Sequence, residues 1–274
     1  MSGVYVDPDT GLPAIDDPSG VRRVLACLQS DPAEKAKLRR FSAAVPVMPE
    51  SEWRDIDRRT TMGSDFILDQ KSHGSCVGFG TAGALMRCAF LNGFPFQRLS
   101  GSYVYSFING GRDQGANIAN ALAVIVEKGT PGEQFCGWDN IYPSRISAEA
   151  RNDAANHKAL ECYVAETFAE MMTAIQLPGF IPVFAVQVGG SFTSLDSEGV
   201  CGFDRGSGNH CVHADGAKKL ARGWTIDMPN SWNLTFGQRG RGRLTARHVE
   251  EVYQECFVIR APNVADPDGP PAAQ

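Results

Sequence analysis

The segment that decides the interpretation of this chain reads Asp69-Gln70-Lys71-Ser72-His73-Gly74-Ser75-Cys76. An apolar run rich in small residues, 77–85, follows directly and predicts a helix that begins at the cysteine. Unpaired N–H groups at a helix N-terminus favour a thiolate, so this position is expected to lower the pKa of the Cys76 thiol. The Gln70 side-chain amide and the Cys76 backbone N–H can each donate to an oxyanion. Cys76 is therefore a candidate nucleophile.

Two segments far downstream supply the groups that a nucleophilic thiol needs. His210 lies 134 residues after Cys76, and Asn230 lies 154 residues after it, just before Ser231-Trp232. A histidine can remove the thiol proton, and an asparagine can orient its ring. His213 is a competing base on the same expected strand. Because side chains alternate across a strand, it should face away from His210.

The order and spacing of these residues resemble those of the papain-like cysteine peptidases, in which the His and Asn follow the Cys by about 130–150 residues. Coverage runs from about Met48 to Arg260. Besides the three segments above, it rests on residues 99–105, 115–122, 127–133, 182–188, 191–192, 199–200, 223–226 and 236–240, which keep the family's order. The resemblance implies an α+β, two-lobed fold, with a helical lobe bearing the nucleophile helix and an antiparallel β lobe bearing the His and Asn. A cleft lies between the lobes.

The resemblance also implies a mechanism: a cysteine endopeptidase that hydrolyses peptide bonds through a thioester. His210 would hold Cys76 as a thiolate, Asn230 would orient the imidazole, and Gln70 with the Cys76 N–H would hold the oxyanion. The partner is then a protein or peptide substrate. Gly115 is a candidate substrate-binding residue, because glycine allows an extended peptide to approach closely; a simple helix lead-in is the alternative. Trp232 is interpreted as substrate-binding, as core, or as an apolar cover over the Asn–His hydrogen bond.

Departures from the family pattern leave other functions open. Family members commonly read Cys-Gly-Ser-Cys-Trp where this chain reads His73-Gly74-Ser75-Cys76-Val77. The disulfide that the first of those cysteines usually forms is therefore absent, as is the aromatic residue. Cys211 places a second thiol beside the expected base. One alternative is a catalytically inactive papain-like scaffold acting as a binding or assembly protein. Another is the same triad acting on a different acyl substrate, as in a transglutaminase, an amidase or a deubiquitinase-like enzyme.

Composition narrows the classes of partner. The chain has 274 residues, 21% of them charged, and a formal net charge of -5, which argues against a nucleic-acid binder. We expect the basic run Arg239–Arg243 to be a solvated turn. The eight cysteines lack Cys-x-x-Cys spacing, so neither a metal nor another cofactor is expected. Residues 1–20 are polar and do not resemble a signal peptide. No apolar run reaches the roughly 20 residues that span a bilayer. The default expectation is therefore an intracellular protein with mostly free thiols.

Three regions are expected along the chain. Residues 1–45 form an N-terminal extension, either a structural or partner-binding arm or a short regulatory pro-segment that plugs the cleft, with one or two helices between Ser19 and Phe41. Residues 46–260 form the peptidase domain. Residues 261–274 form a flexible, proline-rich tail. Helices are predicted at 75–92, 117–128, 148–159 and 168–176, and strands at 183–188, 210–217, 223–228 and 255–259. Asp113 and Glu133 are expected to be solvated.

Overall fold

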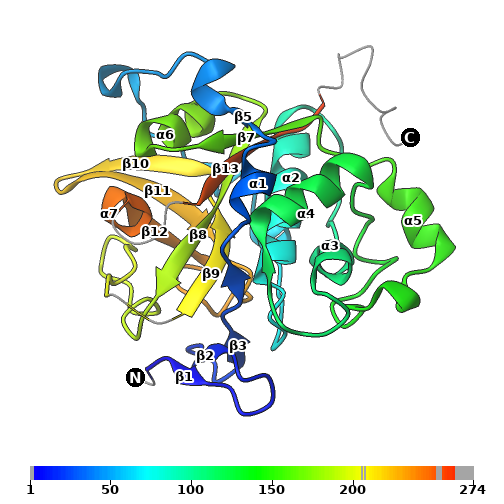
Figure 1. Ribbon diagram of the computed structural model, residues 1–274. Coiled ribbons are helices and arrows are strands. Elements are labelled where there is room, and N and C mark those ends of the chain that lie inside the picture. The colour runs from blue at the N-terminus through cyan, green and yellow to red at the C-terminus, as the bar shows by residue number, and fades with distance from the viewer. Residues whose placement is uncertain (1–2, 205, 207, 251–254, 263–274) are drawn as a thin grey trace.

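The computed structural model of the chain describes residues 3–204, 206, 208–250 and 255–262. Two lobes lie side by side, one built mainly of strands and one of helices (Figure 1). The predicted α+β, two-lobed architecture is confirmed. The nucleophile candidate lies on the helical lobe, and the His and Asn candidates lie on the sheet lobe. Within the described residues, no helix combines the length and the apolar character that crossing a membrane requires.

A buried helix, α2, forms the centre of the helical lobe and packs against the sheet lobe. Thirteen of its sixteen residues are buried, so it lies inside the core rather than on the surface. Glycines allow this close packing, since a Cβ at Gly80 would lie 2.8 Å from the Cys211 sulfur. A Cβ at Gly83 would lie 2.7 Å from the His213 ring. The lobe contains α2 (Cys76–Leu91), α3 (Gly101–Ile108), α4 (Ile118–Glu127) and α5 (Ala148–Ala154), with the short strand β6 (Ala116–Asn117).

The sheet lobe combines a five-stranded and a three-stranded sheet. The larger has the order β5-β7-β13-β8-β9, with bounds Arg39–Arg40, Glu161–Ala165, Cys256–Arg260, Phe180–Val188 and Gly208–His213. The smaller is the antiparallel sheet β10 (Gly216–Leu220), β11 (Gly223–Pro229) and β12 (Arg241–Thr245). Helices α6 (Phe168–Gln176) and α7 (Ala246–Glu250) complete the lobe. Short 3-10 turns lie at Phe41–Ala43, Glu50–Glu52, Ser64–Phe66 and Pro143–Arg145.

The prediction of a solvated turn at Arg239–Arg243 is wrong for two of its arginines. Arg241 and Arg243 lie on β12 with side chains 7% and 5% exposed, and they pair with Asp215 and Asp227. Asp215 also pairs with Arg87 of α2, at 2.9 Å. Because a buried charge without a partner is costly, this network ties the nucleophile helix to the sheet lobe.

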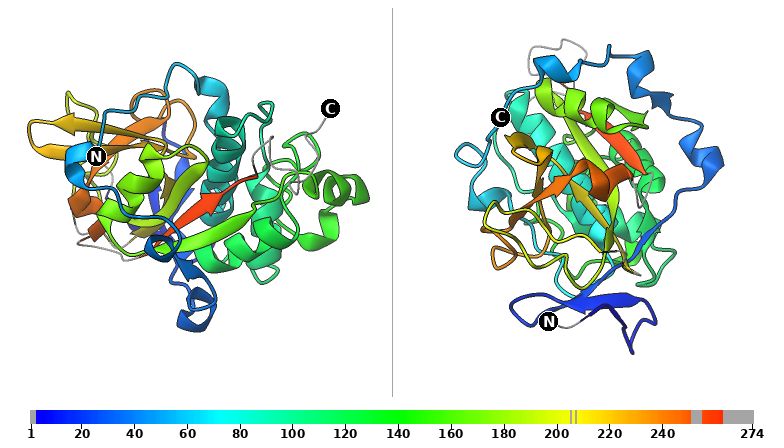
Figure 2. Two further views of the ribbon diagram at one scale, coloured as in Figure 1. Left: turned by 90° about the horizontal axis from the view of Figure 1, so that it is seen from above. Right: turned by 90° about the vertical axis from the view of Figure 1, so that its left-hand side faces the viewer.

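The N-terminal segment is also arranged differently from the prediction. It begins with a three-stranded sheet of β1 (Tyr5–Val6), β2 (Pro13–Asp16) and β3 (Arg22–Val24). Of the one or two helices predicted between Ser19 and Phe41, one short helix is present, α1 (Pro32–Lys35), whereas the apolar stretch before it is extended in β3 and β4 (Cys27–Leu28). We call residues 22–28 the arm. The arm passes between the two lobes, and the chain then continues along the outside to β5 (Figures 1 and 2). Residues 24–27 are all buried, because both lobes cover them.

The C-terminal end of the described chain stays against the helical lobe. Ala261, the first residue of the predicted tail, is buried, and its N–H donates to the Cys88 sulfur at 3.1 Å. Asn92 donates to the Ala261 carbonyl at 2.9 Å. The rest of the predicted flexible tail, 263–274, lies outside the described residues.

Candidate active site

Cys76 is the first residue of α2, as the sequence predicts, and it is completely buried. Its thiol lies against the backbone of Val77, of Ala26 in the arm and of Cys211 in β9. Ser75 precedes it as the helix N-cap. The nucleophile candidate thus lies where the helix start, the arm and the strand carrying His210 meet.

His210 and Asn230 are paired on the sheet lobe. The His210 Nε2 and Asn230 Oδ1 are 2.8 Å apart. The Ser231 N–H donates to the same Oδ1 at 2.8 Å, which fixes the orientation of the amide. Because that oxygen only accepts, the imidazole carries its proton on Nε2 and leaves Nδ1 as an acceptor.

The ring of Trp232 covers this pair. Its centroid lies 4.7 Å from that of the His210 ring, and the tryptophan is fully buried. The His210 Nδ1 is buried and has no hydrogen-bond partner among the described residues. Among the described residues, the His210 Nδ1 therefore makes no hydrogen bond to Cys76. The structure therefore brings together His210, Asn230 and Trp232, and it places Cys76 against the backbone of the residue that follows His210.

Gln70 bridges the loop before Cys76 and the segment after Asn230. Its Nε2 donates to the His73 carbonyl at 3.0 Å, and its Oε1 accepts from the Ser231 hydroxyl at 2.7 Å. Its backbone N–H donates to the Ser231 carbonyl at 2.9 Å. Two hydrogen bonds thus hold the side-chain amide, and the residue is fully buried. One Nε2 hydrogen remains for another acceptor.

Asp113 is a residue of this region that sequence reasoning missed, since it was expected to be solvated. It accepts from the Gly74 N–H at 3.0 Å, from His73 at 3.1 Å and from the Tyr105 hydroxyl at 2.7 Å. Burial alone would raise the pKa of Asp113, but the hydrogen bonds from His73 and Tyr105 outweigh it and lower the pKa. The carboxylate thus fixes the loop before Cys76, and His73 of that loop stands where the family usually has a disulfide cysteine.

The arm occupies the space between the two lobes at the candidate site. On one side Ala26 forms a parallel bridge with Asn209, and on the other its carbonyl accepts from the Ala116 N–H at 3.1 Å. Cys27 pairs with Ala116 in parallel register. At Gly115 (φ +84°) a Cβ would lie 2.5 Å from the Ala26 oxygen, so only glycine allows this approach. The extended peptide against Gly115 is therefore part of the chain itself.

A buried arginine holds the arm in place. Arg23 is 1% exposed and pairs with Asp17 and with Asp69, the latter at 2.6 Å. It also donates to the backbone carbonyls of Lys71 and Trp232, each at 3.1 Å. Asp69 and Lys71 flank Gln70, so this side chain joins the arm to both segments that carry site residues. Arg23 is a second residue that sequence reasoning missed.

The covered site keeps both reacting groups neutral. Burial raises the pKa of Cys76 to about 12, opposite in direction to the helix N-terminus effect expected from the sequence. Burial likewise lowers the pKa of His210 to about 4; the Asn230 hydrogen bond offsets part of this, and the Arg23 charge adds to it. With the arm in place, the pair therefore exists at neutral pH as thiol and imidazole rather than as an ion pair.

This pKa shift predicts that acid loosens the arm. When water reaches His210, its pKa should return toward its ordinary value of about 6.5, so the open form binds a proton that the covered form does not. Opening is then favoured as pH falls from about 6.5 to 4, by up to about tenfold per pH unit. Hydrogen exchange of the amides of residues 22–28, corrected for intrinsic rates, measures this. In a His210→Gln variant, the exchange rates of these amides should no longer depend on pH in this window. The same pH dependence in His210→Gln as in wild type would contradict the assignment to His210.

The fold matches solved structures of papain-like cysteine proteases at low sequence identity. Xylellain, a cysteine protease from Xylella fastidiosa, is 17% identical, covering 87% of this chain and 96% of that one with a TM-score of 0.66. The ragweed pollen cysteine protease Amb a 11, in its proform, is 18% identical over 82% and 70% of the two chains, with a TM-score of 0.65. Bromelain from Ananas comosus in complex with the E64 inhibitor is 19% identical over 78% and 99%, with a TM-score of 0.59. No family model and no curated protein matches the sequence. The chain has the papain-like fold.

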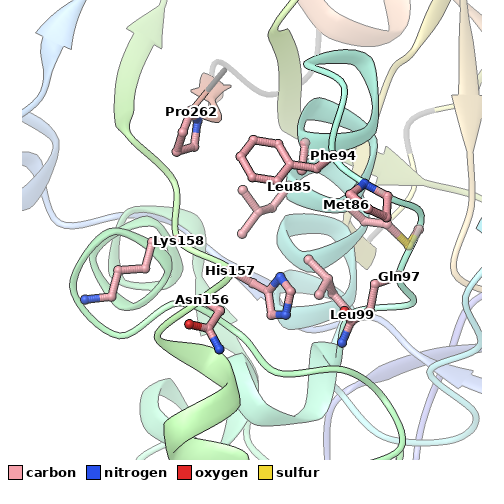
Figure 3. Close-up of a pocket in the computed structure, with 11 residues that line it drawn as sticks. Leu85, Met86, Phe94, Gln97, Leu99, Asn156, His157, Lys158 and Pro262 are labelled. Atoms are coloured by element: carbon pink, nitrogen blue, oxygen red, sulfur yellow. The ribbon is translucent and has the colours of Figure 1, made fainter. Parts of the chain in front are cut away.

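Several pockets of the described residues lie away from this site, and one of them is beside α2. It is lined by residues of α2 and by the segments 94–99 and 156–158, with Pro262 (Figure 3). Its volume of about 50 Å³ is suited to water rather than to a ligand, since ligand pockets measure about 300–1,000 Å³. We assign it no role in the chemistry.

Proposed function

We infer that this chain is a cysteine endopeptidase that acts through Cys76, His210 and Asn230. The observation that carries the proposal is the buried His210–Asn230 pair, whose Nδ1 has no partner within the described residues. The Asn230 hydrogen bond holds the ring through Nε2, and the cover of Trp232 fixes its plane, so the acceptor nitrogen is the one left for a proton. An imidazole that accepts a proton from Cys76 needs that nitrogen free.

The proposed reaction begins when the arm leaves the cleft. The His210 Nδ1 takes the proton of Cys76, and Asn230 holds the ring through Nε2. The thiolate attacks a peptide carbonyl, whose developing oxyanion accepts from the Cys76 N–H and the Gln70 Nε2. The imidazolium protonates the leaving amine, and water then hydrolyses the thioester. Gly115 would let the backbone of the substrate approach as closely as that of Ala26 does, and Trp232 would line the same cleft.

Residues 1–45 are proposed to act as a pro-segment. Support comes from the contacts of Ala26 and Arg23 described above and from the neutral state that their coverage imposes on Cys76 and His210. Two of the similar solved structures are proteases with their pro-segments, Amb a 11 in its proform and procathepsin L 3 of Tenebrio molitor. The arm would therefore keep the enzyme inactive until it is displaced.

Peptide hydrolysis by the full chain, before and after cleavage near the arm, tests the proposed function. Lys37 and Arg40 are exposed, with side chains 67% and 65% accessible, so brief trypsin treatment followed by a trypsin inhibitor should cut there. Hydrolysis of mixed peptides that appears only after cutting, and that a Cys76→Ala chain lacks, is the expected result. Binding of a partner by a folded chain without any hydrolysis would favour the scaffold alternative.

Gln70→Ala should lower kcat/KM by about 10²–10³ without abolishing activity, because it removes one of two oxyanion donors. The matched control is Gln97→Ala in the pocket of Figure 3, which should leave kcat/KM unchanged. Steady-state kinetics of the activated enzyme distinguishes the two. A Gln70→Ala enzyme with unaltered kcat/KM would remove this residue from the proposed oxyanion hole.

A further inference from the structure

Three buried thiols meet at the candidate site, and they come from three separate segments. Cys27 belongs to the arm, Cys76 begins α2 and Cys211 lies on β9, with exposed fractions of 1%, 0% and 1%. All eight cysteines of the chain are free. The mechanism proposed above uses only Cys76, so the other two thiols have no role in it.

Cys27 and Cys211 contact each other directly. Their side chains interact with each other, and both belong to the same apolar core cluster. The backbones are fixed on both sides of the contact, because Ala26 bridges to Asn209 and Cys27 pairs with Ala116. A Cβ at Gly80 would lie 2.8 Å from the Cys211 sulfur, so α2 packs closely against this side chain. The two sulfurs are therefore positioned in the covered form of the protein.

We propose that Cys27 and Cys211 form a reversible disulfide that fastens the arm in the cleft. The bond would join residues 184 positions apart in sequence and leave the Cys76 sulfur unmodified underneath. After a cut in the exposed stretch 36–40, an arm without this bond can diffuse away. A tethered arm keeps an effective concentration of about millimolar and remains in place. Release would then require both a cut and a reductant. The effect on activity rests on the proposed function; the disulfide itself does not.

The oxidant is a small-molecule disulfide, which reacts with the two protein thiols in two successive exchange steps. During a transient opening of the arm, the Cys27 thiolate attacks one sulfur of the reagent, forms a mixed disulfide and expels one thiolate, which takes up the proton that Cys27 lost. After the arm returns, Cys211 loses its proton and attacks the Cys27 sulfur, expelling the second reagent thiolate, which is protonated in turn. Two protein thiols are oxidised and one reagent disulfide is reduced to two thiols.

Peptide mapping after incubation with oxidised glutathione tests the proposal on the full chain. Trypsin cuts after Lys and Arg, so each cysteine of interest falls in its own peptide, 24–35 for Cys27, 206–218 for Cys211 and 72–87 for Cys76. We expect a cross-linked 24–35/206–218 pair that disappears on reduction. Cys27→Ser and Cys211→Ser should lose it, whereas Cys136→Ser, in the helical lobe, should keep it. The chain should be mapped as wild type and as Arg23→Ala, in which the arm opens more often and the Cys27 peptide becomes 23–35, because cleavage then follows Arg22.

The retention of the arm gives a second readout. In oxidised wild type cut by trypsin between residues 36 and 40, the arm fragment should stay attached without reductant and leave when reductant is added. In Cys27→Ser it should leave in both cases. A cross-link that involves peptide 72–87, or no cross-link in either wild type or Arg23→Ala, would overturn the proposal.

Activity separates this inference from the proposed function. A reducible Cys27–Cys211 bond in a chain that never hydrolyses peptides would leave the disulfide standing and reject the peptidase. Hydrolysis that appears equally after cutting oxidised and reduced protein would support the peptidase and reject the fastening role.

Discussion

Replacing Arg23 by alanine is expected to release the arm and to raise the rate at which thiol reagents label Cys76 by roughly 100-fold or more. The substitution removes the ion pairs with Asp17 and Asp69 and both hydrogen bonds to the Lys71 and Trp232 carbonyls. Asp69 keeps an ion pair with Lys71, but the Asp17 side chain is fully buried and loses its ion-pair partner, which costs about 3–5 kcal/mol in such pairs. Here the arm can respond by leaving the cleft, so that Asp17 meets water.

Arg22→Ala is the matched control for this prediction. Arg22 is the preceding residue, but it pairs with Asp7 and Asp9 inside the N-terminal sheet and not with either lobe. Its loss should leave the labelling rate of Cys76 close to wild type. The measurement is the rate of modification of peptide 72–87 at neutral pH in the intact chains. Equal rates in Arg23→Ala and Arg22→Ala would mean that the ion pair with Asp69 does not hold the arm.

Cys76→Ala is expected to abolish peptide hydrolysis, with a loss of about 10⁶ in kcat if this enzyme depends on its nucleophile as other acyl-transfer enzymes do. His210→Ala should cost a similar factor, because the thiol then has no base and the effects of residues that act as a unit do not add. The measurement is hydrolysis after activation, with folding checked by circular dichroism.

Cys211→Ser serves as the control, since Cys211 lies beside His210 but takes no part in the proposed acyl transfer. It should retain most of the activity of the reduced enzyme. Full activity in Cys76→Ala would reject the assigned nucleophile. Loss of activity in Cys211→Ser together with full activity in Cys76→Ala would transfer the role to the second thiol.

The motifs of the sequence located the site because they lie on regular elements. The apolar run after Cys76 predicted α2. An apolar face of Ile118, Leu122, Ile125 and Val126 predicted α4, although Val126 is exposed. The His210–Asn230 hydrogen bond could be expected from the resemblance alone, and the alternation of side chains placed His213 on the opposite face, against Gly83 of α2. These features follow from local pattern and spacing.

The arm could not be predicted because its environment is tertiary. Val24, Leu25, Ala26 and Cys27 form a short apolar run, which periodicity alone cannot assign to a strand or a helix. The run is extended, from the end of β3 to the start of β4, because a lobe covers each of its faces. Arg23 and Asp113 were missed for a related reason, since a lone charged residue in sequence gives no sign of the buried partners that the fold supplies. Burial also reverses the pKa shift expected for Cys76, because its effect outweighs that of the helix N-terminus.

Labelling with an epoxide inhibitor of papain-like enzymes tests the central claim most directly. The intact Arg23→Ala chain would be treated with the epoxide, mapped by peptide mass and compared with Arg23→Ala combined with His210→Ala. We predict that the label falls on Cys76 alone among the eight cysteines, and only where His210 is present. Label spread over several cysteines, or equal labelling of Cys76 without His210, would contradict an activated nucleophile and leave the papain-like fold without its proposed chemistry.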